Sequence, residues 1–227
     1  MTPGRKADLD PQSRAALQKV LDLLAIERAS VSSVTAPNQA WKVHVTDSLT
    51  GLEVPELQEA VQVADIGSGA GFPGLVLAIS LPEAKVELVE SIGRKCAFIE
   101  RAAAEAGIAN AHVINARSED LAKGPGRETY DVVTARAVGR LSTLAELASP
   151  LLKENGVLVA WKGKRDKDEE SQLARAADEL AMRPEAILNV GDRAGSQHRH
   201  LHVIRKQGST PENLPRKAGM AKKRPKG

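Results

Sequence analysis

The sequence predicts an α/β protein in which a seven-stranded, mostly parallel sheet lies behind an N-terminal helical cap. Three observations support this. From Val61 onward, short apolar stretches alternate with longer amphipathic ones, residues 1–60 show only helical patterns, and the last two strand patterns have no helix between them. Alternating strands and helices are typical of a parallel sheet with helices on both faces. We therefore expect one domain made of a cap (residues 1–60), an α/β core (61–207) and a tail (208–227).

The cap is expected to contain three helices. Residues 12–28 carry apolar side chains at helical spacing, which predicts an amphipathic helix; these are Leu17, Val20, Leu21 and Leu24. Pro37 begins a second predicted helix that runs to about Leu49, and Pro55 begins a short one that ends near Ala60.

The core is expected to contain seven strands and four helices. The strands are predicted at 61–66, 85–89, 111–115, 131–135, 156–161, 185–190 and 200–204. The helices are predicted at about 71–80, 93–106, 140–149 and 167–180. Turn-rich residues 191–197 join the last two strands, so these strands should pair antiparallel at one edge. Hydrophobic residues make up 42% of the chain but aromatic ones only 2%, so Ala, Val, Leu and Ile must fill the core.

The end of the chain is strongly basic. The last 23 residues hold eight Lys or Arg against one acid, Glu212, whereas residues 1–204 sum to −4 within a net charge of +3. Basic terminal segments commonly meet phosphate backbones, although a tail that only improves solubility fits equally well. Because Pro, Gly and Lys dominate from Gly208, we expect residues 208–227 to be disordered.

The composition favours a cytoplasmic protein. No apolar stretch reaches the roughly 18 residues that span a membrane, and Met1–Asp10 has no apolar signal region. The single cysteine, Cys96, cannot form an internal disulfide and is expected to be a small buried hydrophobe. We expect no membrane association and a monomer.

The strongest local signal is the run Asp65-Ile66-Gly67-Ser68-Gly69-Ala70-Gly71-Phe72-Pro73-Gly74, between an apolar strand and a helix. Sheets of this class bind ligands at the carboxyl ends of their strands, and glycines let a ligand approach the backbone. The spacing Gly-x-Gly-x-Gly differs from the Gly-x-Gly-x-x-Gly of dinucleotide folds. A carboxylate at Asp65 would repel a pyrophosphate but suit the ammonium group of an amino-acid-bearing ligand.

A second acid points to a nucleoside cofactor. Glu90 ends the second strand, 21 residues after Gly69, where a carboxylate can accept hydrogen bonds from both ribose hydroxyls. S-adenosylmethionine combines a ribose with a charged methionine portion and has no phosphate. Asp65, Gly67, Gly69, Gly71 and Glu90 therefore predict a site for S-adenosylmethionine; a purely structural glycine turn is the alternative.

The chain resembles the bacterial 16S ribosomal RNA guanine N(7)-methyltransferase family called RsmG or GidB. The resemblance covers roughly residues 15–220 in unbroken order. The segments that carry it are His44–Leu49, Asp65–Gly74, Glu90–Lys95, Asp131–Ala137, Pro150–Leu152, Trp161–Gly163 and Thr210–Gly219.

This resemblance implies a class I S-adenosylmethionine-dependent methyltransferase fold, which is Rossmann-like. It implies that the cofactor site is lined by Gly67, Phe72, Ser118, Glu119 and Arg136. An ordinary helix-capping pair is the alternative for Ser118-Glu119. The implied substrate is the guanosine conventionally numbered 527 in 16S ribosomal RNA of the small ribosomal subunit.

Arg136 is the predicted catalytic side chain. It ends the fourth strand, at the same sheet edge as the glycine loop. Arginine commonly reads the O6 and ring nitrogen 7 edge of guanine, but a donor on nitrogen 7 would block methylation there. Arg136 must therefore contact a phosphate, the cofactor or another base edge, unless it forms a structural salt bridge. His44 and Asp47, three residues apart on one helical face, either brace the cap over the cofactor or stabilise their helix.

RNA binding is expected to depend on charge, because aromatic residues are scarce. Besides the basic residues after position 217, the candidates are Arg94, Lys95, Lys162, Lys164, Arg165, Arg199, Arg205, Arg216 and Lys217. No metal site is expected, since His198-x-His200-x-His202 alternates along a strand and should form one exposed face.

Two other functional classes fit parts of the pattern. A dinucleotide-dependent oxidoreductase is disfavoured by the glycine spacing and by Asp65. A noncatalytic RNA-binding protein on the same fold is disfavoured by the intact loop, because an inactive site has no need of Gly67, Gly69 and Gly71.

Overall fold

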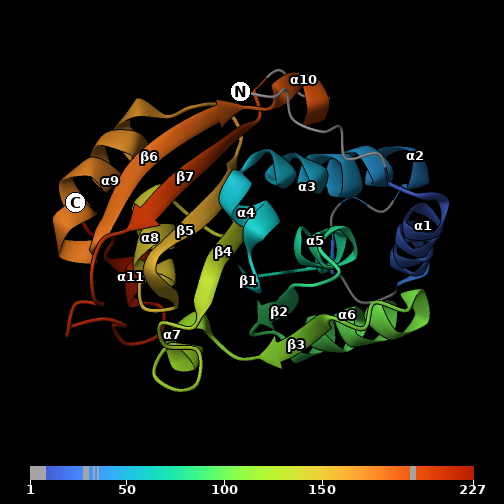
Figure 1. The fold of residues 1–227 in the computed structure, drawn as a ribbon, viewed down its shortest axis with the longest axis horizontal. Helices are drawn as coiled ribbons and strands as arrows, with labels where there is room; N and C mark the ends of the chain where they lie inside the picture. Colours follow the sequence, from blue (N-terminus) through green and yellow to red (C-terminus); the bar gives the residue numbers. More distant parts are fainter. Residues whose placement is uncertain (1–8, 28–30, 33, 35, 195–197) are drawn as a thin grey trace.

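The computed structural model describes residues 9–27, 31–32, 34, 36–194 and 198–227. Its seven-stranded sheet has the order β3-β2-β1-β4-β5-β7-β6 (Figure 1). The strands are β1 (Gln62–Ile66), β2 (Lys85–Glu90), β3 (Ala111–Asn115), β4 (Tyr130–Arg136), β5 (Leu152–Lys162), β6 (Met182–Asn189) and β7 (His200–Lys206). The first five pair in parallel, whereas β7 pairs antiparallel with both β5 and β6. The predicted mostly parallel sheet with an antiparallel edge is confirmed.

The helices of the core follow the sequence pattern closely. They are α5 (Gly74–Ser80), α6 (Gly93–Ala106), α7 (Ser118–Leu121), α8 (Leu141–Ala148), α9 (Lys167–Leu180) and α10 (Gly191–Ala194). Helix α5 begins three residues later than predicted, because Gly71 takes a left-handed φ of 88° that a right-handed helix cannot include. The short helices α7 and α10 were not predicted, and residues 195–197 of the predicted turn lie outside the described residues.

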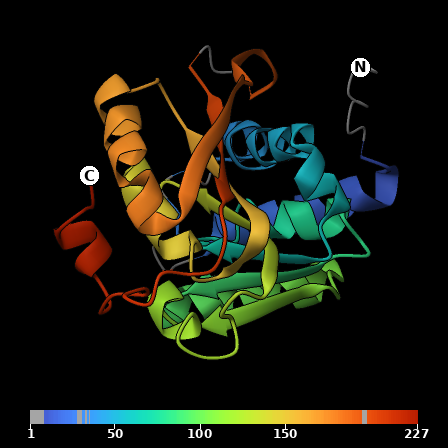
Figure 2. The same ribbon diagram turned by 60° about the vertical axis from the view of Figure 1, so that its left-hand side comes forward.

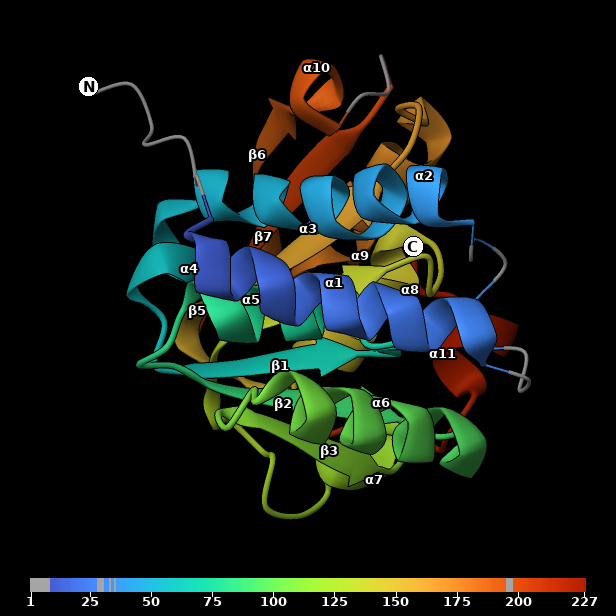
Figure 3. The same ribbon diagram turned by 90° about the vertical axis from the view of Figure 1, so that its right-hand side faces the viewer.

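The cap begins with α1 (Pro11–Ile26), whose start is fixed by Asp10. The Asp10 carboxylate accepts hydrogen bonds from the backbone N–H groups of Gln12 (2.8 Å) and Ser13 (2.9 Å), which a helix start would otherwise leave unpaired. The predicted apolar stripe is buried; it consists of Leu17, Val20, Leu21 and Leu24. Figure 3 shows α1 lying across one side of the molecule between the second part of the cap and α6.

The second part of the cap is one continuous helical rod with a widened middle turn. It consists of α2 (Pro37–Ala40), the π-helical stretch η1 (Trp41–Thr46), α3 (Asp47–Leu49) and the 3₁₀ turn η2 (Thr50–Glu53). The short α4 (Pro55–Glu59) then leads into β1. Short π-helical stretches frequently occur at functional sites. This one carries His44 and ends beside Asp47, the pair that the sequence singled out.

Two hydrophobic cores lie on the two faces of the sheet. On one face, cap residues and side chains of α5 and α6 pack on alternate residues of the strands, such as Val63 of β1 and Val132 of β4. On the other face, α8 and α9 pack on the residues between them, such as Ala64 and Val133. Figure 1 shows α8 and α9 on the opposite side of the strands from α5 and α1. Burial of one large aliphatic side chain contributes about 2 kcal/mol, so both layers stabilise the sheet.

The tail is ordered, which corrects the prediction of disorder for residues 208–227. Its start is held by Lys206, fully buried, whose Nζ donates to Glu128 Oε1 (2.8 Å), Thr210 Oγ1 (2.7 Å) and the Leu152 carbonyl (2.7 Å). The side chain of Leu214 is buried in the second core, and Arg127 donates to its carbonyl (3.1 Å). The composition predicted a solvated chain, because contacts between residues far apart in the sequence cannot be recognised from composition.

The end of the tail packs beside α8 and α9. Arg216 forms an ion pair with the buried carboxylate of Glu146 in α8, and the short α11 (Met220–Lys223) follows. The Thr143 hydroxyl of α8 donates to the Ala221 carbonyl (3.2 Å). Figure 2 shows this red segment running beside α9. No helix among the described residues is long and apolar enough to cross a membrane.

Candidate active site

Two cavities open where the carboxyl ends of the parallel strands meet the cap and the tail. The loop pocket, of about 320 Å³, is lined by the glycine loop, the end of β2, the start of α7 and the tail. The cap pocket, of about 370 Å³, is lined by the cap, the ends of β4 and β5, and Arg199. The segment after β4 separates them, since Val138 lines the loop pocket and Ala137 and Gly139 line the cap pocket.

The glycine loop forms one wall of the loop pocket through Gly67. Its φ of 65° is left-handed, and a Cβ there would lie 2.7 Å from a methyl group of Val138, so only glycine fits. The Gly67 N–H donates to the Val89 carbonyl at the end of β2 (2.8 Å), which ties the loop to the neighbouring strand. Gly69 also has a left-handed φ, 62°, and its N–H donates to Glu90 Oε2 (3.0 Å).

Glu90 is held in place by the backbone and faces the loop pocket. Its Oε2 accepts from Gly69 and its Oε1 accepts from the Ile92 N–H (2.9 Å). The side chain lines the pocket and the residue is 6% exposed. Each carboxylate oxygen can accept two hydrogen bonds, so both oxygens retain a free lone pair for hydroxyl groups of a ligand.

Ser118 and Glu119, which the resemblance assigns to a cofactor site, line the loop pocket together with Gly67. They are not a capping pair, because Arg117 occupies the N-cap position of α7 and no side chain caps this helix. Instead, Glu119 Oε1 accepts a hydrogen bond from the backbone N–H of Gly219 (2.7 Å). No sequence pattern predicted this contact. It brings the tail to the pocket, where Gly219, Ala221, Lys222 and Lys223 complete the lining.

Asp65 lies beneath the glycine loop and lines neither pocket, so the structure does not bring it to the pocket surface where the predicted contact with a ligand's ammonium group would be made. It is fully buried, and its oxygens accept from the Gly74 N–H (3.1 Å) and the Thr134 hydroxyl (2.9 Å). Burial raises the pKa of Asp65 to about 6, against the hydrogen bonds from Thr134 and Gly74, which lower it. Asp65 therefore supports the loop from below.

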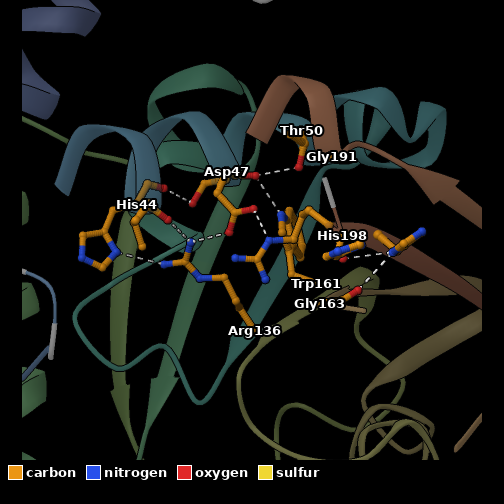
Figure 4. Close-up of polar contacts among 12 residues, drawn as sticks. His44, Asp47, Thr50, Arg136, Trp161, Gly163, Gly191 and His198 are labelled. Carbon is orange, nitrogen blue, oxygen red and sulfur yellow. Dashed lines mark hydrogen bonds and ion pairs between the residues drawn. The ribbon is translucent and has the colours of Figure 1, made fainter. Parts of the chain in front are cut away.

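Arg136 ties the cap to the sheet (Figure 4). Its Nη1 donates to the Val43 carbonyl (2.9 Å) and to Asp47 Oδ2 (3.0 Å), and its Nη2 lies 3.3 Å from His44 Nδ1. The predicted pair His44 and Asp47 thus meets on Arg136, which supports the bracing alternative over a helix-stabilising pair. Burial lowers the pKa of Arg136, while the charge of Asp47 opposes that effect.

His44 is neutral, and its hydrogen bonds fix which ring nitrogen carries the proton. His44 Nε2 lies 2.8 Å from the Val34 carbonyl, which can only accept, so Nε2 is the donor and Nδ1 accepts from Arg136. Burial is the main effect that lowers the pKa of His44, and the charge of Arg136 adds to it. The ring stacks on Phe72, with centroids 4.6 Å apart and planes 15° apart. Phe72, implied to line the cofactor site, thereby joins the glycine loop to the cap.

Asp47 also binds a second arginine from the far end of the chain. Arg199 Nε lies 2.8 Å from Asp47 Oδ1, so one buried carboxylate stands between two guanidinium groups. The Trp161 ring N–H donates to the Asp47 carbonyl (2.9 Å), which joins β5 to the same residue. The sequence placed Arg199 among RNA-binding candidates, but no sequence pattern related it to Asp47, 152 positions away.

The predicted RNA-binding residues divide into two groups. Carboxylates partly neutralise one group within the protein; its members are Lys162 (with Glu169), Arg165 (Glu170), Arg199 (Asp47), Arg205 (Glu56 and Glu185) and Arg216 (Glu146). Arg94, Lys164 and Lys217 are exposed and Lys95 is half-buried, and no ion pair involves them within the described residues. The RNA contacts of both groups stay predictions.

Cys96 is buried, as predicted, and its thiol donates to the Glu90 carbonyl (3.2 Å). The expected exposed histidine face is wrong for His202, which is 4% exposed and lies near Glu169 and Glu170 of α9. Across the part of the chain that the structure describes, no three His, Cys, Asp or Glu side chains are grouped as metal ligands.

Comparison with known proteins gives consistent matches over most of the chain. Residues 15–201 match the family model GidB, described as rRNA small subunit methyltransferase G. A ribosomal RNA small subunit methyltransferase G of Desulfitobacterium hafniense is 39% identical over 202 residues, which is 88% of this chain and 82% of that protein. One of Pelotomaculum thermopropionicum is 39% identical over 206 residues, 89% of this chain and 86% of that protein.

Solved structures match the fold at low sequence identity. A mutant of MtNAS in complex with S-adenosylmethionine aligns with a TM-score of 0.58 and 12% identity. The alignment covers 86% of this chain and 73% of that chain. At this identity the match concerns the fold alone.

Proposed function

This chain belongs to the GidB family, rRNA small subunit methyltransferase G, and we propose that it transfers a methyl group from S-adenosylmethionine to ring nitrogen 7 of the guanosine conventionally numbered 527 in 16S ribosomal RNA. Its fold is the predicted class I methyltransferase fold, with a seven-stranded sheet in which β7 runs antiparallel to both of its neighbours. The observation that carries the proposal is the loop pocket, with Gly67 and two carboxylates at the carboxyl edge of the sheet.

The residues of the loop pocket fit S-adenosylmethionine. Glu90 offers free lone pairs at the end of β2, where ribose hydroxyls can donate to a carboxylate, and Gly67 allows close approach to the loop. Ser118 and Glu119 line the same pocket, and we assign them to the adenine ring of the cofactor. The pocket volume of about 320 Å³ lies at the lower end of the range for ligand pockets, roughly 300–1,000 Å³.

Methyl transfer to this nitrogen requires the side chains mainly to position the cofactor and the guanine. The bound cofactor supplies a methyl group on a sulfonium; the S–CH₃ bond breaks as an N–CH₃ bond forms at guanine nitrogen 7, and the positive charge passes from sulfur to the guanine. Nitrogen 7 has a lone pair in the ring plane and no proton, so no general base is needed. Holding two reactants in line can contribute on the order of 7–11 kcal/mol to lowering the barrier.

Arg136 acts as a positioning residue in this scheme. Both N–H groups of its Nη1 bind the cap, and Nη2 binds His44, so the guanidinium holds the cap beside the segment that separates the two pockets. This arrangement keeps its donors away from an incoming guanine nitrogen 7, which must stay free to react.

Methylation mapping tests the proposal. Purified protein is incubated with labelled S-adenosylmethionine and with small ribosomal subunits, or their naked RNA, from a strain that lacks this gene. We expect one methyl group per RNA at nitrogen 7 of guanosine 527, located by nuclease digestion and mass spectrometry. Incorporation at another position would refute the site, and no incorporation into either substrate would refute the activity.

The same proposal extends to partners and location. A substrate in the small ribosomal subunit places the protein in the bacterial cytoplasm, and a complete active-site pocket within one chain suits a monomer. Sedimentation equilibrium at micromolar concentration tests the monomer, and a dimer mass would contradict it.

A further inference from the structure

Among the described residues, the charged side chains that line the cap pocket are all cations. Arg136, Lys162 and Arg199 reach the pocket surface from β4, from β5 and from the residue just before β7. The other lining residues that the structure describes are uncharged; they include Ser32, Gly139 and Trp161, as well as His44, which is neutral. A cavity of about 370 Å³ with this lining selects for an anionic group.

The carboxylates that form ion pairs with these cations are buried behind the side chains that line the cap pocket. Asp47 is 1% exposed and Glu169 is 7% exposed, and neither lines the cavity. Asp47 forms ion pairs with both Arg136 and Arg199, and Glu169 forms one with Lys162. Asp65, which also acts on Arg136 through its charge, is fully buried beneath the glycine loop. The pocket surface itself therefore presents positive charge.

Two of the three cations keep donors for a ligand. Arg199 meets Asp47 through Nε, so neither of its two terminal NH₂ groups has a partner among the described residues, and its side chain is 27% exposed. Lys162 Nζ donates to the Gly139 carbonyl (3.0 Å) and to Glu169 (2.7 Å), which leaves one of its three N–H bonds, and its side chain is 20% exposed. Arg136 is more buried, at 13%, and its donors mostly bind the cap.

We propose that the cap pocket binds a phosphate group of the nucleotide to be methylated, through the terminal NH₂ groups of Arg199 and the Nζ of Lys162. A guanidinium and an ammonium group form short, charge-assisted hydrogen bonds with phosphate oxygens, and such contacts set the register of a nucleic acid without reading its base. The assignment rests on the proposed function, since it names the phosphate subsite of the same active site. In this arrangement Arg199 and Lys162 bind the substrate, whereas Arg136 and Asp47 hold the cap in place beside the pocket.

Calorimetry of the whole protein tests the subsite without any methyl transfer. Guanosine 5′-monophosphate, guanosine and inorganic phosphate are titrated separately into the protein. We expect the monophosphate to bind at least tenfold more tightly than guanosine or phosphate alone. Arg199→Gln and Lys162→Gln should each weaken the monophosphate about tenfold. Lys153→Gln makes the same change of charge at an exposed residue of β5 paired with Asp131, outside both pockets, and should leave it unchanged.

Measurements with substrate RNA provide a second test of the subsite. Arg199→Gln should raise the KM for RNA more than it lowers kcat, and should reduce the slope of log affinity against log salt concentration by about one. Arg199→Lys keeps the charge but loses the paired donors, so it should recover part of the affinity. S-adenosylmethionine affinity and the unfolding temperature check that each variant is folded; where Arg199→Gln fails that check, Lys162→Gln carries the test.

The outcomes separate this inference from the proposed function. Equal affinities for guanosine and its monophosphate, or equal losses in Arg199→Gln and Lys153→Gln, would overturn the phosphate subsite even if the wild-type protein methylates RNA. Phosphate that binds as tightly as the monophosphate would assign the pocket to free phosphate and overturn the nucleotide. Absence of methyl transfer by the wild type refutes the function, yet the calorimetric comparison still decides the subsite.

Discussion

Replacement of Asp65 by asparagine distinguishes the buried support seen in the structure from the ligand contact expected from the sequence. An asparagine can keep both neighbours, since its oxygen accepts from the Gly74 N–H and its NH₂ group donates to the Thr134 hydroxyl. It removes only the charge. If Asp65 supports the loop, Asp65→Asn should leave S-adenosylmethionine affinity within about threefold of wild type, which is less than 1 kcal/mol.

The pKa of Asp65 sets the size of the effect on stability. A rise from 3.8 to about 6 on folding corresponds to about 3 kcal/mol at 1.36 kcal/mol per unit. The folded protein holds the proton more tightly than the unfolded chain, so the favourable contribution is complete below pH 3.8 and is lost as pH rises through about 6. The free energy of unfolding of the wild type relative to Asp65→Asn should therefore fall by about 3 kcal/mol between pH 3.5 and pH 8.

Urea unfolding of both proteins at several pH values between 3.5 and 8 measures this difference, and calorimetry measures cofactor affinity at pH 8. Asp65→Ala is the matched comparison, because it leaves the Gly74 N–H and the Thr134 hydroxyl without partners and should weaken both stability and cofactor binding. Parallel stability curves for wild type and Asp65→Asn would refute the buried-carboxylate reasoning. A tenfold or larger loss of cofactor affinity in Asp65→Asn would instead support a direct contact between Asp65 and the ammonium group.

Three further predictions follow from the site. Arg136→Gln should lower the free energy of unfolding by about 3 kcal/mol and reduce methyl transfer more than cofactor affinity, because it releases the cap from β4; a loss below 1 kcal/mol in urea unfolding would contradict this. Deletion of residues 208–227 should weaken cofactor affinity in calorimetry, because Gly219 and α11 line the loop pocket, and unchanged affinity would mean that the tail is no part of the site. Glu90→Gln should weaken S-adenosylmethionine about tenfold, because a neutral amide has a single accepting oxygen for its backbone and ligand partners; wild-type affinity in the same titration would exclude a ribose contact.

The local elements of the fold could be read from the sequence because they depend on neighbouring residues. Alternating strand and helix patterns set the sheet, and α6 and α9 have the predicted bounds of 93–106 and 167–180. The glycine loop follows from the same local logic, since Gly67 and Gly69 take left-handed backbone conformations that other residues rarely adopt. Its place at the end of β1 then fixes where a ligand must bind.

What joins distant segments was decided only by the tertiary structure. The sequence indicated that Asp65, Arg136 and the tail matter, but it gave wrong or incomplete surroundings for each. Asp65 turns under the loop because Thr134 of the adjacent β4 offers it a donor, and Arg136 meets Asp47 because the cap folds over the sheet. The basic tail is ordered because buried Lys206 and Glu119 bind it at two places. Hydrogen bonds and ion pairs between residues about 70 to 150 positions apart depend on the assembled layers, and no local pattern of residues encodes them.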